Sequence, residues 1–297
     1  MKILIIGGTR FIGKEVVNLL EDIKSNYTVF TRNICFKNKE NYIIGDRNNQ
    51  EDLRKICGNF DVVIDFISYS PSQTKNILNL FPDARYILIS TSWKQTKTLL
   101  NNQNKSNYIK NKRLAELEIK KHENIKNRII RLPIVLGTKD HTGRSDFFKQ
   151  KDKFKPKIVY ITNPDIEICF CWKTEVVKFI INEIFKEKST KSIISYPKSY
   201  YKIRLSELIK FYQAYEKKEY CIRSIDINDV SKDNKFKKYL QNIGDDFYDP
   251  IKILGKSQMR VEDPNKLYAH IRELYDWEWY TNIHWDSNEK QKFRIFI

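Results

Sequence analysis

The sequence has no long hydrophobic run. No apolar segment among its 297 residues approaches the roughly 18 residues that a membrane-spanning helix requires. The N-terminal apolar run covers only residues 3–6 and leads directly into a glycine turn, which is unlike a signal peptide. We therefore expect a cytoplasmic protein with no membrane partner.

The sequence also lacks the spacings of a metal site or a disulfide framework. Its five cysteines include no Cys-x-x-Cys pair, and its four histidines are not spaced as metal ligands. An odd number of cysteines without a framework pattern is typical of reduced thiols in a cytosol. Cys169 and Cys171 lie two apart in an apolar stretch, so we expect them to be buried on one face of a strand. The sequence predicts no metal.

Acidic residues are too few to balance the basic ones. The chain has 37 Asp and Glu against 54 Lys and Arg, which gives a net charge of +17. Such a charge suits nucleic acid or another anionic partner. Lysine is abundant together with Asn and Ile, as in a sequence of biased composition, and the lysines are scattered. We therefore do not expect nucleic acid to be the main partner, and phosphorylated small molecules such as nucleotides and nucleotide sugars remain open.

A strand, a glycine turn and a helix stand at the N-terminus. Residues 3–6 suit a strand buried on both faces, and the two glycines that follow allow a turn that other residues would resist. Apolar residues then recur with helical spacing through residues 11–20. This order is the context of a dinucleotide-binding fingerprint, because a helix N-terminus offers N–H groups to a pyrophosphate. Gly7 and Gly13 take the outer glycine positions of the motif, and Arg10 replaces the middle glycine.

Alternating strand and helix patterns predict an α/β fold with a Rossmann-type, doubly wound parallel sheet. We expect further strands at residues 27–31, 43–44, 61–66, 86–92 and 127–136, and helices at 50–57, 71–80 and from 108 onward. Beyond residue 150 the alternation of strand and helix patterns becomes less regular. The sequence predicts strands there at 158–162, 167–171 and 192–196 and helices at 175–185 and 205–215. We predict a dinucleotide-binding domain over residues 1–160, to which elements from about 170–196 return. A smaller, mixed substrate-binding lobe would cover residues 161–297.

The second predicted strand ends without a carboxylate. Cofactor folds of this type often carry an acidic residue there for the ribose 2′-hydroxyl, whereas this chain has Arg32. A guanidinium suits a 2′-phosphate through paired hydrogen bonds, and Arg10 would lie on the other side of the same phosphate. The sequence therefore predicts NADP rather than NAD, with a solvated Arg32 as the alternative. Asp46 follows the next strand and would meet the adenine amino group or cap a helix.

Tyr108 and Lys112 are four residues apart and therefore share one face of a predicted helix. A lysine ammonium stabilises the phenolate of a tyrosine, whose pKa is otherwise about 10. The tyrosine can then exchange a proton with an alcohol or ketone while hydride moves to or from nicotinamide. The lysine can also hold ribose hydroxyls, and Ser90, Thr91 or Ser92 can bind the substrate oxygen. Tyr-x-x-x-Lys alone is a weak motif among 17 tyrosines, and it gains weight from the order of the preceding elements.

Together these motifs resemble the extended short-chain dehydrogenase/reductase superfamily, in its NAD(P)-dependent epimerase/dehydratase branch. The resemblance covers about residues 1–150, with a weaker likeness to residue 195, and residues 7–13 resemble the glycine motif in the Arg-containing form of some atypical members. It implies an NADP-dependent keto-sugar reductase or epimerase that acts on a nucleotide-linked sugar. It also implies a homodimer through helices that include residues 107–122.

The resemblance also assigns roles to individual residues. Catalysis would fall to Thr91, Tyr108 and Lys112, with Tyr108 as the acid/base. Cofactor binding would fall to Gly7, Thr9, Arg10, Phe11, Ile12, Gly13, Arg32, Asp46, Phe66, Ile67 and Lys112. Ser92 and Arg144 would contact the substrate. Arg10 departs from the family pattern, as does Trp172, which stands where many members have an acidic residue that opens a helix.

A second hypothesis is a non-catalytic member of the same family that binds RNA or senses cofactor. Scattered lysines and the aromatic residues near the C-terminus could bind single-stranded nucleic acid by charge and stacking. Such binding falls steeply with salt, whereas turnover of a substrate would not follow that slope. The presence of both Tyr108 and Lys112 favours the enzyme.

Overall fold

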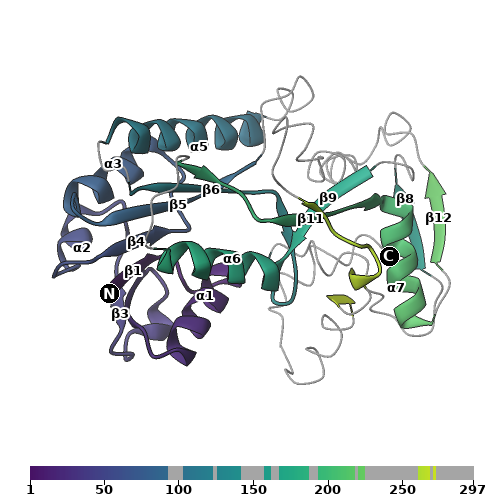
Figure 1. The fold of residues 1–297 in the computed structure, drawn as a ribbon, viewed down its shortest axis with the longest axis horizontal. Coiled ribbons are helices and arrows are strands. Elements are labelled where there is room, and N and C mark those ends of the chain that lie inside the picture. The colour runs from purple at the N-terminus through teal and green to yellow at the C-terminus, as the bar shows by residue number, and fades with distance from the viewer. Residues whose placement is uncertain are drawn as a thin grey trace. The chain divides into compact units, whose positions relative to one another are not determined.

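The computed structural model describes residues 1–92, 103–122, 126–141, 157–161, 167–186, 193–217, 220–224, 260–267 and 270–271. These residues form two compact units (Figure 1). The described residues of Met1–Pro133 and Lys173–Lys198 form the first unit. Those of Ile134–Trp172, Ser199–Gly255 and Arg260–Ile297 form the second. The chain therefore leaves the first unit after residue 133 and returns to it at residue 173.

The first unit is built on a seven-stranded parallel sheet in the order β10-β6-β5-β4-β1-β2-β3. Its strands are β1 (Lys2–Ile6), β2 (Asn26–Thr31), β3 (Tyr42–Ile44), β4 (Val62–Asp65), β5 (Arg85–Thr91), β6 (Arg128–Leu132) and β10 (Ile194–Ser195). The strand order reverses between β1 and β4, so the carboxyl ends of these two strands flank a topological switch point, where such folds bind ligands. The predicted Rossmann-type, doubly wound sheet is confirmed.

Helices cover both faces of this sheet (Figure 1). Helices α3 (Pro71–Leu80) and α5 (Gln103–Lys121) lie on one face, and α1 (Phe11–Asp22) and α6 (Lys173–Phe185) lie on the other. A short helix α2 (Gln50–Arg54) and a 3-10 turn η1 (Ile34–Phe36) complete the connections. The four apolar residues of β1 are 0% exposed, as expected for a strand covered by helices on both sides.

The strand predicted at residues 127–136 is interrupted. Strand β6 ends at Leu132, and β7 (Ile134–Leu136) begins after Pro133 in a different sheet. Proline has no N–H group to donate to a sheet ladder, so the strand breaks there. The prediction of one continuous strand is therefore wrong, and the break coincides with the boundary between the two units.

The second unit contains a four-stranded mixed sheet in the order β13-β11-β9-β7. Strand β9 (Glu167–Trp172) runs parallel to β7 and antiparallel to β11 (Ser199–Arg204), which pairs in parallel with β13 (Arg260–Val261). Strands β8 (Lys157–Ile161) and β12 (Tyr220–Ser224) form a parallel pair, and α7 (Leu205–Glu216) follows β11. The smaller mixed lobe is confirmed, and its substrate-binding role stays a prediction.

Aromatic side chains fill the core of the second unit. Phe170, Trp172, Tyr200, Tyr201 and Tyr212 are each at most 1% exposed. Cys169 and Cys171 of β9 are buried, which confirms the prediction that they pack inside the protein. The aromatic residues near the C-terminus that lie outside the described residues are Phe247, Tyr248, Trp277, Trp279, Tyr280 and Trp285.

Candidate functional site

The loop between β1 and α1 is shaped by close packing around its glycines. Gly7 has a φ of +89°, in the left-handed region that favours glycine. A Cβ atom on Gly7 would lie 2.6 Å from Cγ2 of Ile67, and one on Gly13 would lie 3.0 Å from the carbonyl oxygen of Gly7. Packing therefore requires glycine at both positions, and it brings the start of α1 close to the end of β1.

The N-terminus of α1 fits an anionic group. Arg10 is exposed and occupies the N-cap, its side chain makes no capping hydrogen bond, and the first turn contains no acidic residue. The first N–H groups of a helix lack intrahelical acceptors and carry a partial positive charge, which favours a phosphate. Phe11 has a φ of +42°, a strained conformation of the kind that occurs in ligand-binding loops. This geometry fits the pyrophosphate of a dinucleotide.

Arg32, which is predicted to bind the 2′-phosphate of NADP, lies immediately after β2. The hydroxyl oxygens of Thr9 and Thr31 lie 3.4 Å apart, and Thr31 Oγ1 also accepts a hydrogen bond from the N–H of Asn33. The Arg32 side chain is 73% exposed, and its Nη1 lies 3.7 Å from Oδ2 of Asp46. An ion pair so exposed contributes little to stability, so the guanidinium is available to a ligand.

Asp46 lies in the turn between β3 and α2. Its Oδ1 accepts a hydrogen bond of 2.9 Å from the backbone N–H of Asn48. The N-cap of α2 is Asn49, whose side chain accepts from the N–H of Glu51. The alternative that Asp46 caps this helix is therefore wrong, and its contact with adenine stays a prediction.

A buried ion pair lies at the carboxyl end of β4. Nη1 and Nη2 of Arg47 donate to the two carboxylate oxygens of Asp65 at 2.7 and 2.8 Å, and the Tyr86 hydroxyl donates to Oδ2 at 2.6 Å. The side chains of Arg47 and Asp65 are 5% and 0% exposed. Burial alone would raise the pKa of Asp65. The charge and hydrogen bonds of Arg47, together with the hydrogen bonds from Tyr86 and Ile67, outweigh burial, so the pKa is lowered and the carboxylate is charged. Burial raises the pKa of Tyr86 well above its ordinary value, which keeps the donor protonated.

This pair also positions Ile67, one of the residues predicted to bind the cofactor. Asp65 Oδ1 accepts a hydrogen bond of 3.0 Å from the N–H of Ile67, whose side chain packs against Gly7. Arg47 Nη2 also donates to the carbonyl oxygen of Gln73 in α3 at 3.1 Å. Sequence reasoning missed the pair, although a carboxylate at the end of an apolar strand signals a buried partner. The pair ties the segments after β3 and β4 to α3 and to the glycine loop.

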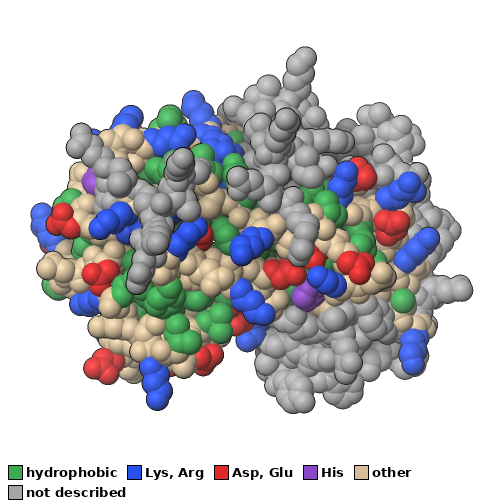
Figure 2. Space-filling view, in the orientation of Figure 1, with side chains coloured by type: hydrophobic (Ala, Val, Ile, Leu, Met, Phe, Trp, Pro, Cys, Tyr) green, Lys and Arg blue, Asp and Glu red, His purple; other side chains and the backbone are tan. Residues whose placement is uncertain are grey.

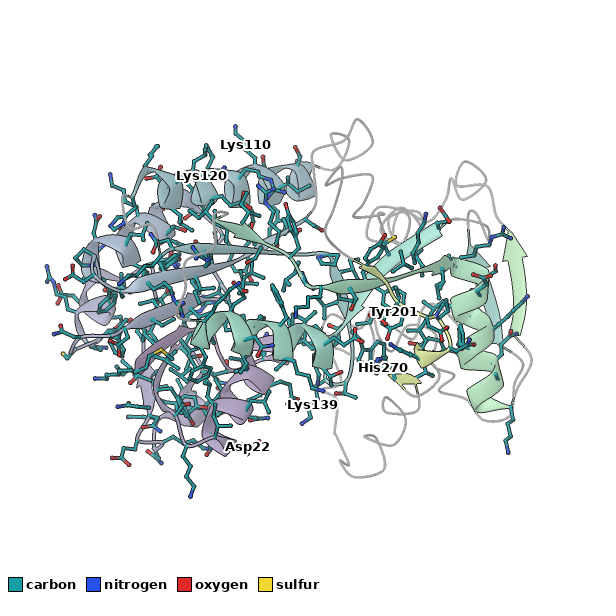
Figure 3. The ribbon with its side chains drawn as sticks, viewed as in Figure 1. Asp22, Lys110, Lys120, Lys139, Tyr201 and His270 are labelled. Atoms are coloured by element: carbon teal, nitrogen blue, oxygen red, sulfur yellow. The ribbon has the colours of Figure 1, made fainter. Side chains whose placement is uncertain are left out.

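Helix α5 carries Tyr108 and Lys112. Lys112 is 2% exposed, and its Nζ donates to the carbonyl oxygen of Ile89 at 2.8 Å and lies 6.0 Å from the centroid of the Tyr108 ring. Burial lowers the pKa of Lys112 to about 8, although the negative charges of Asp65 and Glu116 act to raise it. The ammonium form therefore still predominates at neutral pH. By contrast, Figure 3 shows Lys110 and Lys120 on the outer side of α5.

A second buried network lies where α5 meets β5 and β6. The Ser90 hydroxyl donates to Glu116 Oε1 at 2.5 Å, and Nε and Nη2 of Arg131 donate to the two oxygens of the same carboxylate at 3.0 and 2.5 Å. Arg113 is a third partner of Glu116. Burial alone would raise the pKa of Glu116, but these bonds lower it. Because the Ser90 hydroxyl already donates its proton to Glu116, Ser90 is a poor candidate for the residue that binds the substrate oxygen.

The other two hydroxyl residues lie at the end of β5 and immediately after it. Thr91 and Ser92 are 7% and 1% exposed. The Thr91 carbonyl accepts a hydrogen bond from Arg113, and the Ser92 N–H donates to the carbonyl of Leu132. Both backbone positions are therefore fixed by the sheet and by α5. The predicted substrate contact Arg144 lies outside the described residues.

The second unit holds an aromatic cluster around a histidine. The rings of Trp172 and His270 stack with centroids 4.8 Å apart, and His270 Nε2 lies 3.1 Å from the Tyr201 hydroxyl (Figure 3). His270 is therefore a packed histidine. In the part of the chain that the structure describes, no group of three His, Cys, Asp or Glu side chains could hold a metal ion. No helix within those residues is long and apolar enough to cross a membrane.

The fold and the glycine loop together define a Rossmann-type protein. Residues 3–82 match the model of the NAD dependent epimerase/dehydratase family, which confirms the resemblance over that segment. No curated protein sequence matches the chain. The matched segment contains the glycine loop, Arg32 and the ion pair of Arg47 with Asp65.

Solved structures with the same fold include several sugar-modifying enzymes. The dTDP-glucose 4,6-dehydratase of Bacillus anthracis str. Ames, determined with NAD, has a TM-score of 0.66 at 12% identity, covering 95% of this chain and 97% of that one. The UDP-glucuronic acid 4-epimerase of Bacillus cereus, determined with UDP-glucuronic acid and NAD, has a TM-score of 0.65 at 14% identity, covering 93% and 98%. The UDP-N-acetylglucosamine 4-epimerase of Bacillus cereus has a TM-score of 0.57 at 17% identity, covering 82% and 95%. At these identities the similarity establishes the fold alone.

Proposed function

We propose that this chain is a nicotinamide-dinucleotide-dependent oxidoreductase that acts on a keto sugar, as a reductase or an epimerase. The observation that carries the proposal is Lys112, buried on α5 one helical turn from Tyr108, in a unit whose glycine loop suits a pyrophosphate. The family match over residues 3–82 supports the cofactor class.

The dinucleotide would lie across the carboxyl ends of the strands at the switch point. The glycine loop and the first turn of α1 would hold the pyrophosphate through backbone N–H groups. The residues concerned are Gly7, Thr9, Phe11, Ile12 and Gly13. Phe66 and Ile67, which follow β4, would line the nicotinamide side. Asp46 would contact the adenine.

The choice of NADP rests on two exposed arginines. Arg10 at the N-cap of α1 and Arg32 after β2 would share the 2′-phosphate, which a guanidinium binds with paired hydrogen bonds. The dehydratase and the glucuronic acid epimerase described above were determined with NAD. A direct comparison of NADPH with NADH therefore decides this part of the proposal.

Proton transfer would fall to α5 and the end of β5. When bound, the nicotinamide ring supplies or accepts a hydride. The Tyr108 phenol would give a proton to the substrate carbonyl oxygen or take one from the corresponding alcohol. The Lys112 ammonium favours the phenolate by charge and would also hold the ribose hydroxyls. The Thr91 hydroxyl would orient the substrate oxygen, and Ser92 and Arg144 would contact the rest of the sugar.

The substrate would be a sugar linked to a nucleoside diphosphate. The net charge of +17 suits a diphosphate, and the glucuronic acid epimerase with the same fold was determined with UDP-glucuronic acid. The test is to incubate the protein with NADPH or NADP and a panel of UDP- and dTDP-linked sugars, and to follow products by chromatography. We expect one substrate class to be converted by wild type and not by Tyr108→Phe. Conversion by both proteins would exclude this mechanism.

A second candidate function is RNA binding, which the same net charge favours. Figure 2 shows Lys and Arg side chains distributed over the visible face of the first unit, with Asp and Glu side chains among them. The discriminating measurement is binding of single-stranded RNA at increasing salt. Tight binding with a steep salt dependence, together with no dinucleotide binding, would replace the enzymatic proposal.

A further inference from the structure

Tyr69 lies in the segment between β4 and α3. Its backbone N–H donates to Gln73 Oε1 at 2.7 Å, and the Gln73 amide donates to Asn48 at 2.8 Å. The carbonyl of Gln73 in turn accepts from the buried guanidinium of Arg47. The backbone N–H of Tyr69 is thus held by Gln73, which is itself bonded to Asn48 and Arg47. Tyr69 is nevertheless 51% exposed.

The ring of Tyr69 is the nearer of two aromatic faces around the Lys112 ammonium. Lys112 Nζ lies 5.1 Å from the Tyr69 ring centroid and 6.0 Å from that of Tyr108. The two tyrosine rings are 6.2 Å apart with an interplanar angle of 46°. A cation within about 6 Å of an aromatic face is attracted to it, and the attraction grows when the cation is desolvated. Lys112 meets this condition, since it is 2% exposed.

We propose that Tyr69 is a positioning residue whose ring face holds the Lys112 ammonium in place and in its charged form. The ring acts together with the carbonyl oxygen of Ile89, which accepts the hydrogen bond from Nζ. The catalytic consequence, a phenolate of Tyr108 favoured by a fixed positive charge, rests on the proposed function. The effect of the ring on Lys112 does not rest on it.

Other charged groups act on the same ammonium. Asp65 and Glu116 favour its charged form, whereas burial and the charge of Arg47 oppose it. The result is a pKa of about 8 for Lys112, close enough to neutrality for a small loss of attraction to change its charge. Because a cation–π contact stabilises the ammonium, its removal lowers this pKa further. The alkaline limit of activity would then move to lower pH.

A matched pair of variants separates the ring from the hydroxyl. Tyr69→Phe keeps the ring face, and Tyr69→Leu keeps an apolar side chain without one. We expect the pKa of Lys112 to stay within a few tenths of a unit in Tyr69→Phe and to fall by about one unit in Tyr69→Leu. Phe36→Leu is the control, because Phe36 contacts only Lys14 and Lys39 among the cation–π pairs of the described residues. The control should leave the pKa of Lys112 unchanged.

The measurement is an NMR titration of the full chain labelled with 13C at Cε of lysine, with no ligand added. Lys112→Arg identifies the Lys112 resonance by its loss. A pKa in Tyr69→Leu that equals or exceeds that of Tyr69→Phe would overturn the proposal. An equal fall in both variants would assign the effect to the hydroxyl and would also overturn it.

Cofactor binding then separates this proposal from the proposed function. The expected pKa pattern in a protein that binds neither NADPH nor NADH would leave the role of Tyr69 standing and would end the enzymatic proposal. In an active protein, Tyr69→Leu should also shift the alkaline limb of the kcat profile by the same amount as the pKa, while Tyr69→Phe should not. An unshifted limb in Tyr69→Leu would overturn the link between the ring and catalysis.

Discussion

Replacing Asp65 with asparagine removes one half of a buried ion pair and leaves the other half charged. The Arg47 side chain is 5% exposed, and its two Nη atoms lose their carboxylate acceptors at 2.7 and 2.8 Å. Breaking a buried pair from one side typically costs about 3–5 kcal/mol, because the remaining charge is uncompensated. We expect Asp65→Asn to lower the free energy of unfolding by about this amount, a large fraction of the stability of an ordinary domain.

The contribution of Asp65 has a defined pH dependence. Its folded-state pKa is lowered from the ordinary value of 3.8, so the unfolded chain takes up a proton more readily than the folded one. The stabilisation is therefore fully present above the unfolded-state pKa and is lost as the pH falls through the folded-state pKa. The difference between wild type and Asp65→Asn should be constant near neutral pH and shrink below about pH 4.

Urea unfolding followed by circular dichroism measures the effect. Glu51→Gln is the matched control, because Glu51 pairs with Arg54 at the surface, where the side chains are 74% and 69% exposed, and it should unfold like wild type. The double variant Arg47→Met/Asp65→Leu removes both charges and should recover most of the loss. Unfolding of Asp65→Asn at the same urea concentration as wild type would refute the reasoning.

Three further predictions concern the cofactor, the chemistry and assembly. Arg32→Ala should raise the Kd for NADPH about tenfold or more and leave that for NADH unchanged in fluorescence titrations, because it removes a charge-assisted contact to the 2′-phosphate; equal weakening of both would contradict this. Tyr108→Phe should bind cofactor normally but lose about 100-fold or more in steady-state turnover, and full turnover would rule out its role. Leu114 and Leu117 on α5 are 36% and 47% exposed, so we propose a homodimer through this helix. Light scattering should show twice 35.6 kDa for wild type and 35.6 kDa for Leu117→Glu, and a monomeric wild type would oppose the dimer.

Most of the strands and helices of the first unit could be predicted from patterns within short stretches of the sequence. The apolar runs of β1, β2, β4 and β5 identify strands covered on both faces, because that burial leaves no polar alternation. The glycine loop was predicted from Gly7 and Gly13, which packing requires. The shared helix face of Tyr108 and Lys112 follows from helical periodicity. The functional roles of these residues stay predictions.

Contacts between distant residues were beyond the reach of the sequence. Arg47 and Asp65 lie 18 positions apart in different loops, so only the folded sheet brings their charges together. Lys112 was predicted to act on Tyr108, and nothing in its local sequence indicated the closer ring of Tyr69. The break at Pro133 was missed because the apolar pattern continues on both sides of it.

We propose that the first unit binds a nicotinamide dinucleotide and prefers NADPH. The most direct test is titration of the full chain with NADPH and with NADH, followed by the fluorescence of the reduced nicotinamide. We expect saturable binding of NADPH at least about tenfold tighter than that of NADH, because the exposed guanidinium groups of Arg32 and Arg10 would both bind the 2′-phosphate. Equal affinity for the two nucleotides, or a preference for NADH, would contradict the proposal that Arg10 and Arg32 bind the 2′-phosphate. Binding of neither nucleotide would contradict the account as a whole.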